Sequence, residues 1–303
     1  MPSRIQPFVA TLIAPDAGAE LALALPGLVS LLPDAGTPEW LEPGRAVDVG
    51  FASDATRLPE IRAAVAAWSA AQGGCDAVVQ VLDGRRKKLF LADMDSTMIG
   101  QECIDELADF AGLKSEVAAI TERAMRGELA FEPALRERVA LLAGLLIEVV
   151  DEVIATRLTL TPGGTTLVRT MRANGAYTCL VSGGFTVFTG PVSSRIGFDE
   201  HRGNVLLAED GRLLGQVAEP ILGQAAKLAT LRELRDRLGL TAADTLAIGD
   251  GANDLAMIGE AGLGVAFRAK PAVAAAAAAR IEVTDLTSLL YAQGYRRDDF
   301  VEA

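Results

Sequence analysis

Two aspartates separated by one residue stand at the end of a predicted buried strand, where a side chain can readily meet a ligand. The apolar run Leu89–Ala92 predicts the strand, and the segment Asp93–Thr97, which has the pattern D-x-D-x-T, follows it directly. In open α/β folds, ligands bind in the crevice at the carboxyl ends of the strands, so we expect Asp93 and Asp95 to project into that crevice. Taken alone the pair is only suggestive, because an acidic turn would contain the same residues.

A second segment has the composition of a phosphate-binding loop. Ser182, Gly183 and Gly184 follow the apolar run Tyr177–Val181, which also predicts a buried strand. A hydroxyl beside two glycines lets backbone N–H groups approach an anion closely. An ordinary glycine-rich turn is the alternative for this segment.

A third segment suits a hard cation. The predicted strand Thr245–Ile248 runs into the loop Gly249–Asp254, which contains Asp250, Asn253 and Asp254. Two acidic groups in a glycine-rich loop at a strand end fit a metal ion that prefers oxygen ligands. A metal-free turn is the alternative, although the density of Gly, Asn and Asp makes a functional loop the stronger interpretation.

The chain offers few other catalytic groups. His201 is the single histidine, which excludes a Ser-His-Asp triad built on any other histidine and any multi-histidine zinc site. Cys75, Cys103 and Cys179 are odd in number and lack a CxxC spacing, so we expect reduced, mostly buried thiols. Lys227 lies in a stretch of helical composition, where a lysine is usually solvated, so its role depends on its neighbours.

Charge and hydropathy limit the partners. The net charge of −12 argues against nucleic acid, and the basic run at 85–88 is interpreted as a solvated boundary before a buried strand. No apolar stretch is long and unbroken enough for a transmembrane helix, so no membrane partner is expected. Pro15, Asp16 and Glu20 interrupt the N-terminal region where a signal peptide would be apolar, which predicts a cytoplasmic location. The oligomeric state is not determined, and a homodimer stays open.

The chain divides into two blocks and a short tail. Residues 1–84 predict a small α+β domain, and residues 85–294 alternate strands with helices, which is typical of a doubly wound parallel sheet. A stretch at about 101–161 has helical composition and predicts an inserted helical unit, and residues 295–303 form a C-terminal tail. The remaining expectations are strands at 8–13, 46–51, 77–82 and 263–266, helices at 58–71, 225–238 and 272–279, and mostly loop at 27–42.

The order and placement of these segments resemble the haloacid dehalogenase superfamily of phosphotransferases, over about 88–294. Within it the chain is most similar to the phosphoserine phosphatase branch. The segments DMDSTMIGQECIDELAD, GELAFEPALRERV, VSGGF and GDGANDLAM carry that similarity. The resemblance implies an α/β core with an inserted helical cap, and it is weaker for residues 1–84, which resemble the small ACT-like domain that precedes some bacterial members.

The resemblance also implies a role for each site residue. Asp93 would be the nucleophile and Asp95 the general acid and base, with Mg²⁺ held by Asp93, Asp250 and the backbone carbonyl of Asp95. Asp254 would orient the metal site. The implied substrate contacts are Glu102 to an ammonium group, Arg138 to a carboxylate, Phe131 closing the site, and Ser182, Gly183, Gly184, Lys227 and Asn253 around the phosphate.

These expectations predict magnesium-dependent hydrolysis of phosphoserine, a small-molecule substrate. One rival is a related phosphatase or transferase that acts on another small phosphate, including a transferase that accepts homoserine. A rival of another class is a non-catalytic phosphoacceptor domain, which also uses aspartates and a lysine on a parallel sheet. The long helical insert and the second Asp-rich loop oppose that alternative.

Overall fold

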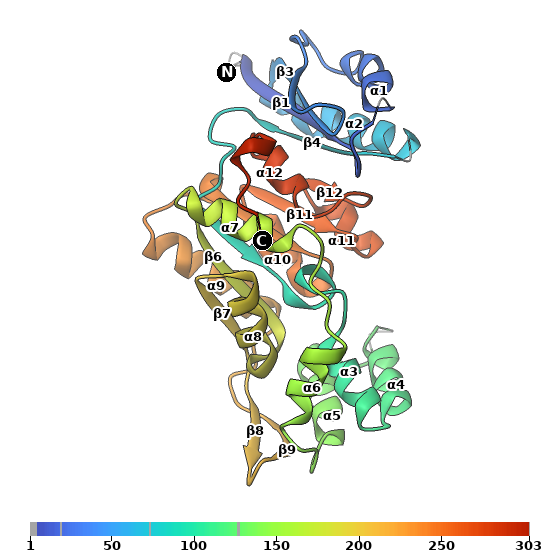
Figure 1. Ribbon diagram of the computed structural model, residues 1–303, viewed down its shortest axis with the longest axis vertical. Helices are drawn as coiled ribbons and strands as arrows, with labels where there is room; N and C mark the ends of the chain where they lie inside the picture. The colour runs from blue at the N-terminus through green and yellow to red at the C-terminus, as the bar shows by residue number, and fades with distance from the viewer. Residues whose placement is uncertain (1–4, 19, 73, 126–127, 303) are drawn as a thin grey trace.

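Three parts follow one another along the long axis of the molecule (Figure 1). The computed structural model describes residues 5–18, 20–72, 74–125 and 128–302. A small antiparallel domain lies at one end, a parallel-sheet core lies in the middle, and a helical cap lies at the other end (Figure 1). The crevice between core and cap is therefore far from the N-terminal domain.

The N-terminal domain is an antiparallel sheet covered by two helices. Its sheet has the order β2-β3-β1-β4, and the chain order βαββαβ is that of ferredoxin-like domains. The small α+β prediction is confirmed, whereas an ACT-like character stays a prediction. The elements are β1 (Ile5–Ile13), α1 (Glu20–Val29), β2 (Glu39–Glu42), β3 (Ala46–Asp54), α2 (Leu58–Gln72) and β4 (Asp76–Val81), with a 3₁₀ turn at Ala55–Arg57.

The segment 27–42 is mostly loop, as expected, but both of its ends belong to regular elements. Helix α1 extends to Val29 although it contains Pro26. Leu21 and Leu28 are buried against the sheet, so tertiary packing outweighs the proline and glycine signals. The other end of the segment pairs with β3 as the short strand β2.

The core is a six-stranded parallel sheet with the order β12-β11-β10-β5-β6-β7, so the doubly wound prediction is confirmed. Its strands are β5 (Leu89–Ala92), β6 (Tyr177–Phe185), β7 (Glu200–Asn204), β10 (Thr245–Gly249), β11 (Leu263–Phe267) and β12 (Ala279–Ile281). Its helices are α7 (Gly164–Ala173), α8 (Thr186–Ile196), α9 (Gln224–Arg237), α10 (Leu255–Glu260), α11 (Pro271–Ala276) and α12 (Ser288–Ala292), with 3₁₀ turns at Ala242–Asp244, Ala252–Asp254 and Arg297–Asp299.

Alternate residues of β5 face the two helical layers. Leu89 and Leu91 pack in one apolar cluster with Leu231 of α9, whereas Phe90 and Ala92 pack in another with helices α7 and α8. Full burial of a leucine contributes about 1.5–3 kcal/mol, so this strand is held from both faces. The loop that follows it therefore starts from a fixed point.

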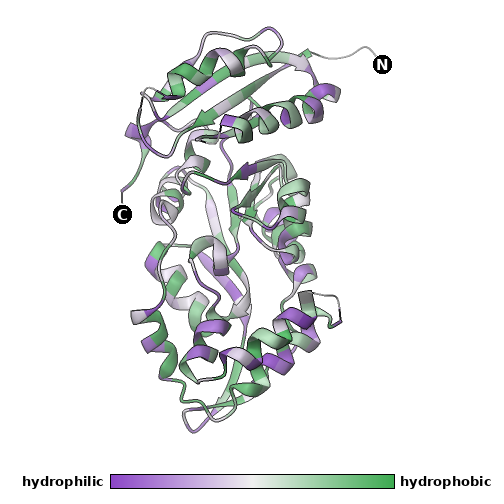
Figure 2. Cartoon of the chain, turned by 90° about the vertical axis from the view of Figure 1, so that its right-hand side faces the viewer, coloured by the Kyte–Doolittle hydropathy of each residue, from purple (hydrophilic) through white to green (hydrophobic). Residues whose placement is uncertain are grey.

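Two insertions cover the carboxyl edge of the sheet. The predicted helical insert contains α3 (Cys103–Phe110), α4 (Lys114–Met125), α5 (Phe131–Leu141) and α6 (Val149–Thr156). The chain enters and leaves it side by side, where Ile99 pairs with Leu160 in an isolated bridge. Figure 2 shows hydrophobic and hydrophilic residues along these helices, as expected when one face packs and the other is solvated.

The second insertion is a hairpin that the sequence interpretation missed. Strands β8 (Leu206–Glu209) and β9 (Arg212–Val217) pair antiparallel beside α5, and Leu146 bridges to Arg212. Asp210 and Gly211 form the tip, both with positive φ. Asp-Gly is a strong signal for a two-residue hairpin turn, so this element could have been predicted.

Two other expectations need correction. The helix predicted over 272–279 ends at Ala276, and Ala279 begins the edge strand β12, so the alanine run serves two elements. The basic run at 85–88 is not uniformly solvated, because Lys87 is buried and donates to the carbonyls of Gly84 and Ala243, while Arg85 pairs with Asp48. The alanine run becomes a strand where it pairs with β11, whereas Arg85 is drawn out of solvent by a carboxylate of the N-terminal domain.

The two domains are joined by a buried carboxylate. Asp76 of β4 accepts hydrogen bonds from the backbone N–H groups of Glu282, Val283 and Thr284 and from the Thr284 hydroxyl. The proposed boundary near residue 84 lies in the segment between β4 and β5. Within the described ranges, no helix combines the length and apolarity needed to cross a bilayer.

Candidate active site

The loops after three parallel strands meet at one cavity of about 670 Å³ beneath the cap. Asp93 and Asp95 follow β5, Ser182 lies near the end of β6, and Asp250 follows β10. A second cavity, of about 730 Å³, lies between α2 and α11, and alanine is its commonest lining residue. Only the first of these two combines several carboxylates with the Ser182–Gly184 segment, which is called the phosphate-type loop. It is therefore the candidate site.

Lys227 is buried between two carboxylates behind the cavity floor. Its Nζ lies 2.7 Å from Asp93 Oδ1 and 2.7 Å from Asp254 Oδ1, and its side chain is 0% exposed. Burial alone would lower the pKa of Lys227, but the two carboxylates raise it, so the lysine carries its charge. From the sequence alone, a lysine in a helix is expected to be solvated, and the structure shows that Lys227 is buried instead.

The two oxygens of Asp93 have different surroundings. Oδ1 faces the Lys227 ammonium and accepts a hydrogen bond from Met94 N at 2.7 Å. Among the described residues, Oδ2 receives no hydrogen bond, and the side chain borders the cavity. Burial, followed by the charge of Asp254, raises the pKa of Asp93, so nearby positive charge is needed to keep it ionised.

Asp95 is held by the cap and by the phosphate-type loop. Its Oδ1 accepts from the backbone N–H of Cys103 at 3.0 Å, at the start of α3, and its Oδ2 accepts from Ser182 Oγ at 3.1 Å. Burial raises the pKa of Asp95 although these hydrogen bonds oppose the shift. Burial therefore makes the protonated form of Asp95 easier to reach than in water, a shift that the sequence could not show.

The Ser182–Gly184 segment comes from an irregular end of β6. Strand β6 extends to Phe185, beyond the predicted end, and its pairing with β7 shifts register between Val181 and Phe185. A Cβ at Gly184 would lie 2.7 Å from Asp95 Oδ2, so glycine allows the close approach of loop and acid. Gly184 N donates to Ser182 Oγ at 2.8 Å, which fixes that hydroxyl.

Three carboxylates could hold a metal ion. Oxygens of Asp93, Asp250 and Asp254 lie within 4.8 Å of one another, and oxygen donors of this kind suit a hard divalent cation. Both oxygens of Asp254 already accept hydrogen bonds, one from Lys227 and one from Gly251 N. Asp93 and Asp250 are therefore the more available metal ligands. Thr97 donates to Asp250 at 3.3 Å, a contact that the D-x-D-x-T pattern did not reveal.

The cap supplies the opposite wall of the cavity. Glu102, Phe131 and Arg138 all line it, so the structure brings these predicted substrate contacts to the same cavity as Asp93 and Asp95. Ser96 has a positive φ of 54° and donates to Glu102 Oε1 at 2.7 Å. Burial and then Asp95 raise the pKa of Glu102 to about 7, whereas burial lowers that of Arg138.

The remaining predicted residues divide between the cavity wall and its support. Gly183, Gly184 and Asn253 line the cavity, while Lys227 and Asp254 act from behind it. The sequence interpretation missed Lys270, which lines the cavity at the start of α11. Its position after a parallel strand was the signal that could have indicated it.

A parallel sheet with a cap, a buried lysine between aspartates, and a Ser-Gly-Gly loop facing carboxylates define a phosphotransfer-type hydrolase. The family model for haloacid dehalogenase-like hydrolases matches residues 90–259. The chain belongs to that family.

Comparisons with individual proteins extend the likeness in both directions along the chain. A protein of Streptomyces coelicolor named phosphoserine phosphatase is 45% identical over 256 residues, which span 84% of this chain but 62% of the relative. A hydrolase of Salmonella enterica serovar Typhi has a TM-score of 0.84 at 28% identity and covers 94% of this chain and 97% of its own. A structure titled as a phospho-aspartyl intermediate analogue of phosphoserine phosphatase is 40% identical, with a TM-score of 0.63 over 70% of this chain and 99% of its own.

Replacing Lys227 by methionine should leave two buried carboxylates without their shared cation. Removing one partner of a buried ion pair costs about 3–5 kcal/mol, so we expect a fall of that size in the free energy of unfolding measured in urea. The double variant Lys227→Met/Asp254→Asn should recover part of the loss. Lys114→Met, at an exposed pair with Asp109, is the control and should unfold like the unmodified protein. If Lys227→Met has the same free energy of unfolding as the unmodified protein, the buried charge cluster is contradicted.

Proposed function

We propose that this protein hydrolyses O-phospho-L-serine to serine and phosphate with Mg²⁺, through a phosphoaspartate intermediate. The observation that carries the proposal is the position of Glu102 and Arg138, which line the same cavity as Asp93 and Asp95. A carboxylate and a guanidinium match the ammonium and carboxylate of an amino acid. The names of the relatives in Streptomyces coelicolor and among solved structures support the same substrate.

Asp93 is the nucleophile in this proposal. Among the described residues its Oδ2 receives no hydrogen bond, while Oδ1 is held by Lys227 and Met94 N, and the side chain borders the cavity. Attack of Oδ2 on phosphorus forms the phosphoaspartate and releases the serine oxygen, which splits hydrolysis into two easier steps. Water then attacks the phosphorus of that intermediate and releases phosphate and free Asp93.

Asp95 carries the proton in both steps. Its raised pKa favours a protonated carboxyl, which gives its proton to the departing serine oxygen. The resulting carboxylate then takes a proton from the attacking water. The Cys103 amide holds Oδ1 of Asp95, so the position of this carboxyl would be maintained even when the Ser182 hydroxyl, which contacts Oδ2 in the free protein, turns to the phosphate.

The phosphate oxygens would be bound by the Ser182 hydroxyl, the backbone of Gly183 and Gly184, and Asn253. Lys227 adds positive charge from behind Asp93. Arranged donors of this kind stabilise the spreading charge of phosphoryl transfer without reorganising during the reaction.

Magnesium fits the carboxylate oxygens of the cavity floor. Asp93, Asp250 and the backbone carbonyl of Asp95 would hold it, and Asp254 would orient the set. When bound, the ion would neutralise charge and act as a template for the phosphate. A dianionic phosphate would otherwise meet two facing carboxylates, so a cation is expected on electrostatic grounds.

The main rival is a related enzyme that passes the phosphoryl group to an acceptor alcohol such as homoserine. Measuring free phosphate against phosphohomoserine separates hydrolysis from transfer. A non-catalytic phosphoacceptor would be phosphorylated once per chain, so multiple turnover excludes it. The cytoplasmic location and the homodimer stay predictions.

A screen of small phosphorylated metabolites, with and without Mg²⁺, tests the proposal directly. We expect phosphoserine to be the preferred substrate and a chelator to abolish turnover. Asp93→Asn should lose turnover while its circular dichroism spectrum is unchanged, because an amide is a poor nucleophile. Rates near those of the unmodified protein would rule out Asp93 as the nucleophile.

Replacing Arg138 by alanine should separate substrate recognition from chemistry. Losing a charge-assisted pair typically costs about 1.5–3 kcal/mol, so kcat/KM for phosphoserine should fall about tenfold or more. The ester p-nitrophenyl phosphate has no carboxylate and should be affected much less. Equal losses on both substrates would show that Arg138 does not bind the carboxylate.

The affinity for phosphoserine should rise with pH through neutrality. With a pKa of about 7, the ionised fraction of Glu102 grows from about one tenth at pH 6 to about nine tenths at pH 8. Because the ammonium group pairs with the ionised form, KM for phosphoserine should fall about tenfold more than KM for p-nitrophenyl phosphate. Comparing the two substrates cancels the ionisation of the phosphate itself near pH 6. Glu102→Gln should remove the difference, and its persistence in that variant would contradict the assignment.

A further inference from the structure

A buried asparagine lies between the phosphate-type loop and the helix that carries Lys227. Asn204 ends strand β7 and is 3% exposed. Its Nδ2 donates to the carbonyls of Gly183 at 2.8 Å and Leu222 at 3.1 Å, and its Oδ1 accepts from Leu222 N at 2.7 Å. Only this orientation of the amide satisfies all three contacts, since the flipped form would set its oxygen against two carbonyls.

On one side, Asn204 replaces a missing strand contact. The pairing of β6 with β7 shifts register between Val181 and Phe185, so the carbonyl of Gly183 falls in the irregular part of the ladder. The Asn204 amide provides its hydrogen bond instead. A buried carbonyl without such a donor would be costly, so the side chain and the loop geometry depend on each other.

The same hydrogen bond continues toward the proton carrier. In a planar trans peptide, the Gly183 carbonyl and the Gly184 N–H point in opposite directions, so fixing one fixes the other. Gly184 N donates to Ser182 Oγ at 2.8 Å, and Ser182 in turn donates to Asp95 Oδ2 at 3.1 Å. Asn204 thus orients the peptide that determines where the Ser182 hydroxyl points.

On the other side, Asn204 fixes the beginning of helix α9. It binds both backbone groups of Leu222, one residue before Gly223, the N-cap. Lys227 N donates to the Gly223 carbonyl at 3.1 Å, so the lysine is only one helical turn away. The path from Asn204 to the Lys227 backbone therefore has three short steps: the hydrogen bonds to Leu222, the peptide bond from Leu222 to Gly223, and the hydrogen bond between Gly223 and Lys227.

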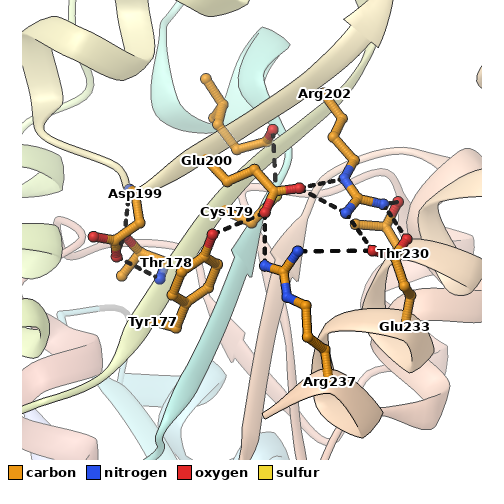
Figure 3. Close-up of polar contacts among 10 residues, drawn as sticks. Tyr177, Thr178, Cys179, Asp199, Glu200, Arg202, Thr230, Glu233 and Arg237 are labelled. Atoms are coloured by element: carbon orange, nitrogen blue, oxygen red, sulfur yellow. Dashed lines mark hydrogen bonds and ion pairs between the residues drawn. The ribbon is translucent and has the colours of Figure 1, made fainter.

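The far end of α9 is bound to the same strand β7 (Figure 3). Arg202 binds Glu233 of α9 through two nitrogens, at 2.6 and 2.9 Å, and Glu200 accepts from Arg237 at 2.8 Å. Burial alone would raise the pKa of Glu200, but hydrogen bonds from Arg237, Tyr177 and Arg202 hold it at about 2. The helix is thus attached to β7 at both ends, by charges at one and by Asn204 at the other.

Phe131 of the cap contacts both of the segments that Asn204 joins, at Gly183 and Gly223. A Cβ at Gly183 or at Gly223 would lie 3.2 Å from the ring of Phe131, so this ring packs against both glycines. The two glycines belong to the two segments that Asn204 joins. A change in their separation would move the ring that closes the cavity.

We propose that Asn204 is a positioning residue for phosphate binding, which sets the Gly183–Gly184 peptide and the start of α9 at their working separation. The proposal rests on the proposed function for its substrate but not for its binding test. Because the contacts lie at the phosphate end of the cavity, loss of Asn204 should weaken every phosphate ligand alike. That pattern differs from the loss at Arg138, which should be selective for phosphoserine.

The test compares Asn204→Ala with Asn174→Ala, a control whose amide donates to Thr170 O at 2.9 Å in α7. The dissociation constant of inorganic phosphate is measured by calorimetry with Mg²⁺ present, and unfolding is followed by thermal denaturation. We expect Asn204→Ala to raise that constant about tenfold, and to lower kcat/KM by similar factors for phosphoserine and p-nitrophenyl phosphate. The control should leave both quantities unchanged. If Asn204→Ala does not fold, Asn204→Ser, which keeps a donor and an acceptor, carries the same measurements.

The outcomes separate this inference from the proposed function. A phosphate constant within about twofold of the unmodified protein, with only a lower melting temperature, would overturn the positioning role while leaving phosphoserine hydrolysis intact. A protein that does not hydrolyse phosphoserine but binds phosphate in an Asn204-dependent manner would overturn the function and support the inference. A fall in kcat/KM for phosphoserine alone, with p-nitrophenyl phosphate unaffected, would also overturn the positioning role of Asn204. Its contacts would then act on the amino-acid end of the substrate instead of the phosphate end.

Discussion

The site depends on one buried cation between two buried carboxylates. Lys227 has no exposed surface, and its ammonium lies 2.7 Å from both Asp93 and Asp254. Burying three charges is costly unless they are paired and hydrogen-bonded, so the surrounding structure must hold all three in place. It does so with the sheet, which fixes Asp93, and with Gly251 N, which binds Asp254. The result is a carboxylate at the cavity with one oxygen held by Lys227 and Met94 N and one that receives no hydrogen bond from the described residues.

The balance of charge in the cavity explains the need for further cations. Asp93, Asp95, Glu102 and Asp250 all line it, and burial raises the pKa of each of them. Such a concentration of acids would repel a phosphate, although phosphate chemistry is what the loop geometry favours. A divalent ion held by the aspartates would resolve this conflict, and the Arg138 guanidinium adds positive charge on the cap side. The acidic cavity is therefore consistent with the proposed anionic ligand only if cations accompany it.

The cap contacts the loop after β5 directly. The first amide of α3 binds Asp95, and the neighbouring Glu102 accepts from Ser96 of that loop. Phe131 of α5 packs against glycines from two segments of the core. If the proposed roles hold, substrate recognition by the cap and the position of the Asp95 carboxyl are linked through short hydrogen-bonded paths. The N-terminal domain lies at the end of the molecule opposite to the cap (Figure 1).

The sequence by itself determined the four central strands of the core sheet, β5, β6, β10 and β11, together with the order of the loops and the residue types that meet at the carboxyl edge. Short continuous apolar runs such as Leu89–Ala92, followed directly by polar or glycine residues, indicate buried strands, and this pattern is visible in the sequence without tertiary information. Only the tertiary structure decided the burial of Lys227, the hydrogen bonds that hold Asp95, and the role of Asn204. These features arise from contacts between residues far apart in the chain, and a local pattern does not encode whether a lysine or an asparagine finds a buried partner.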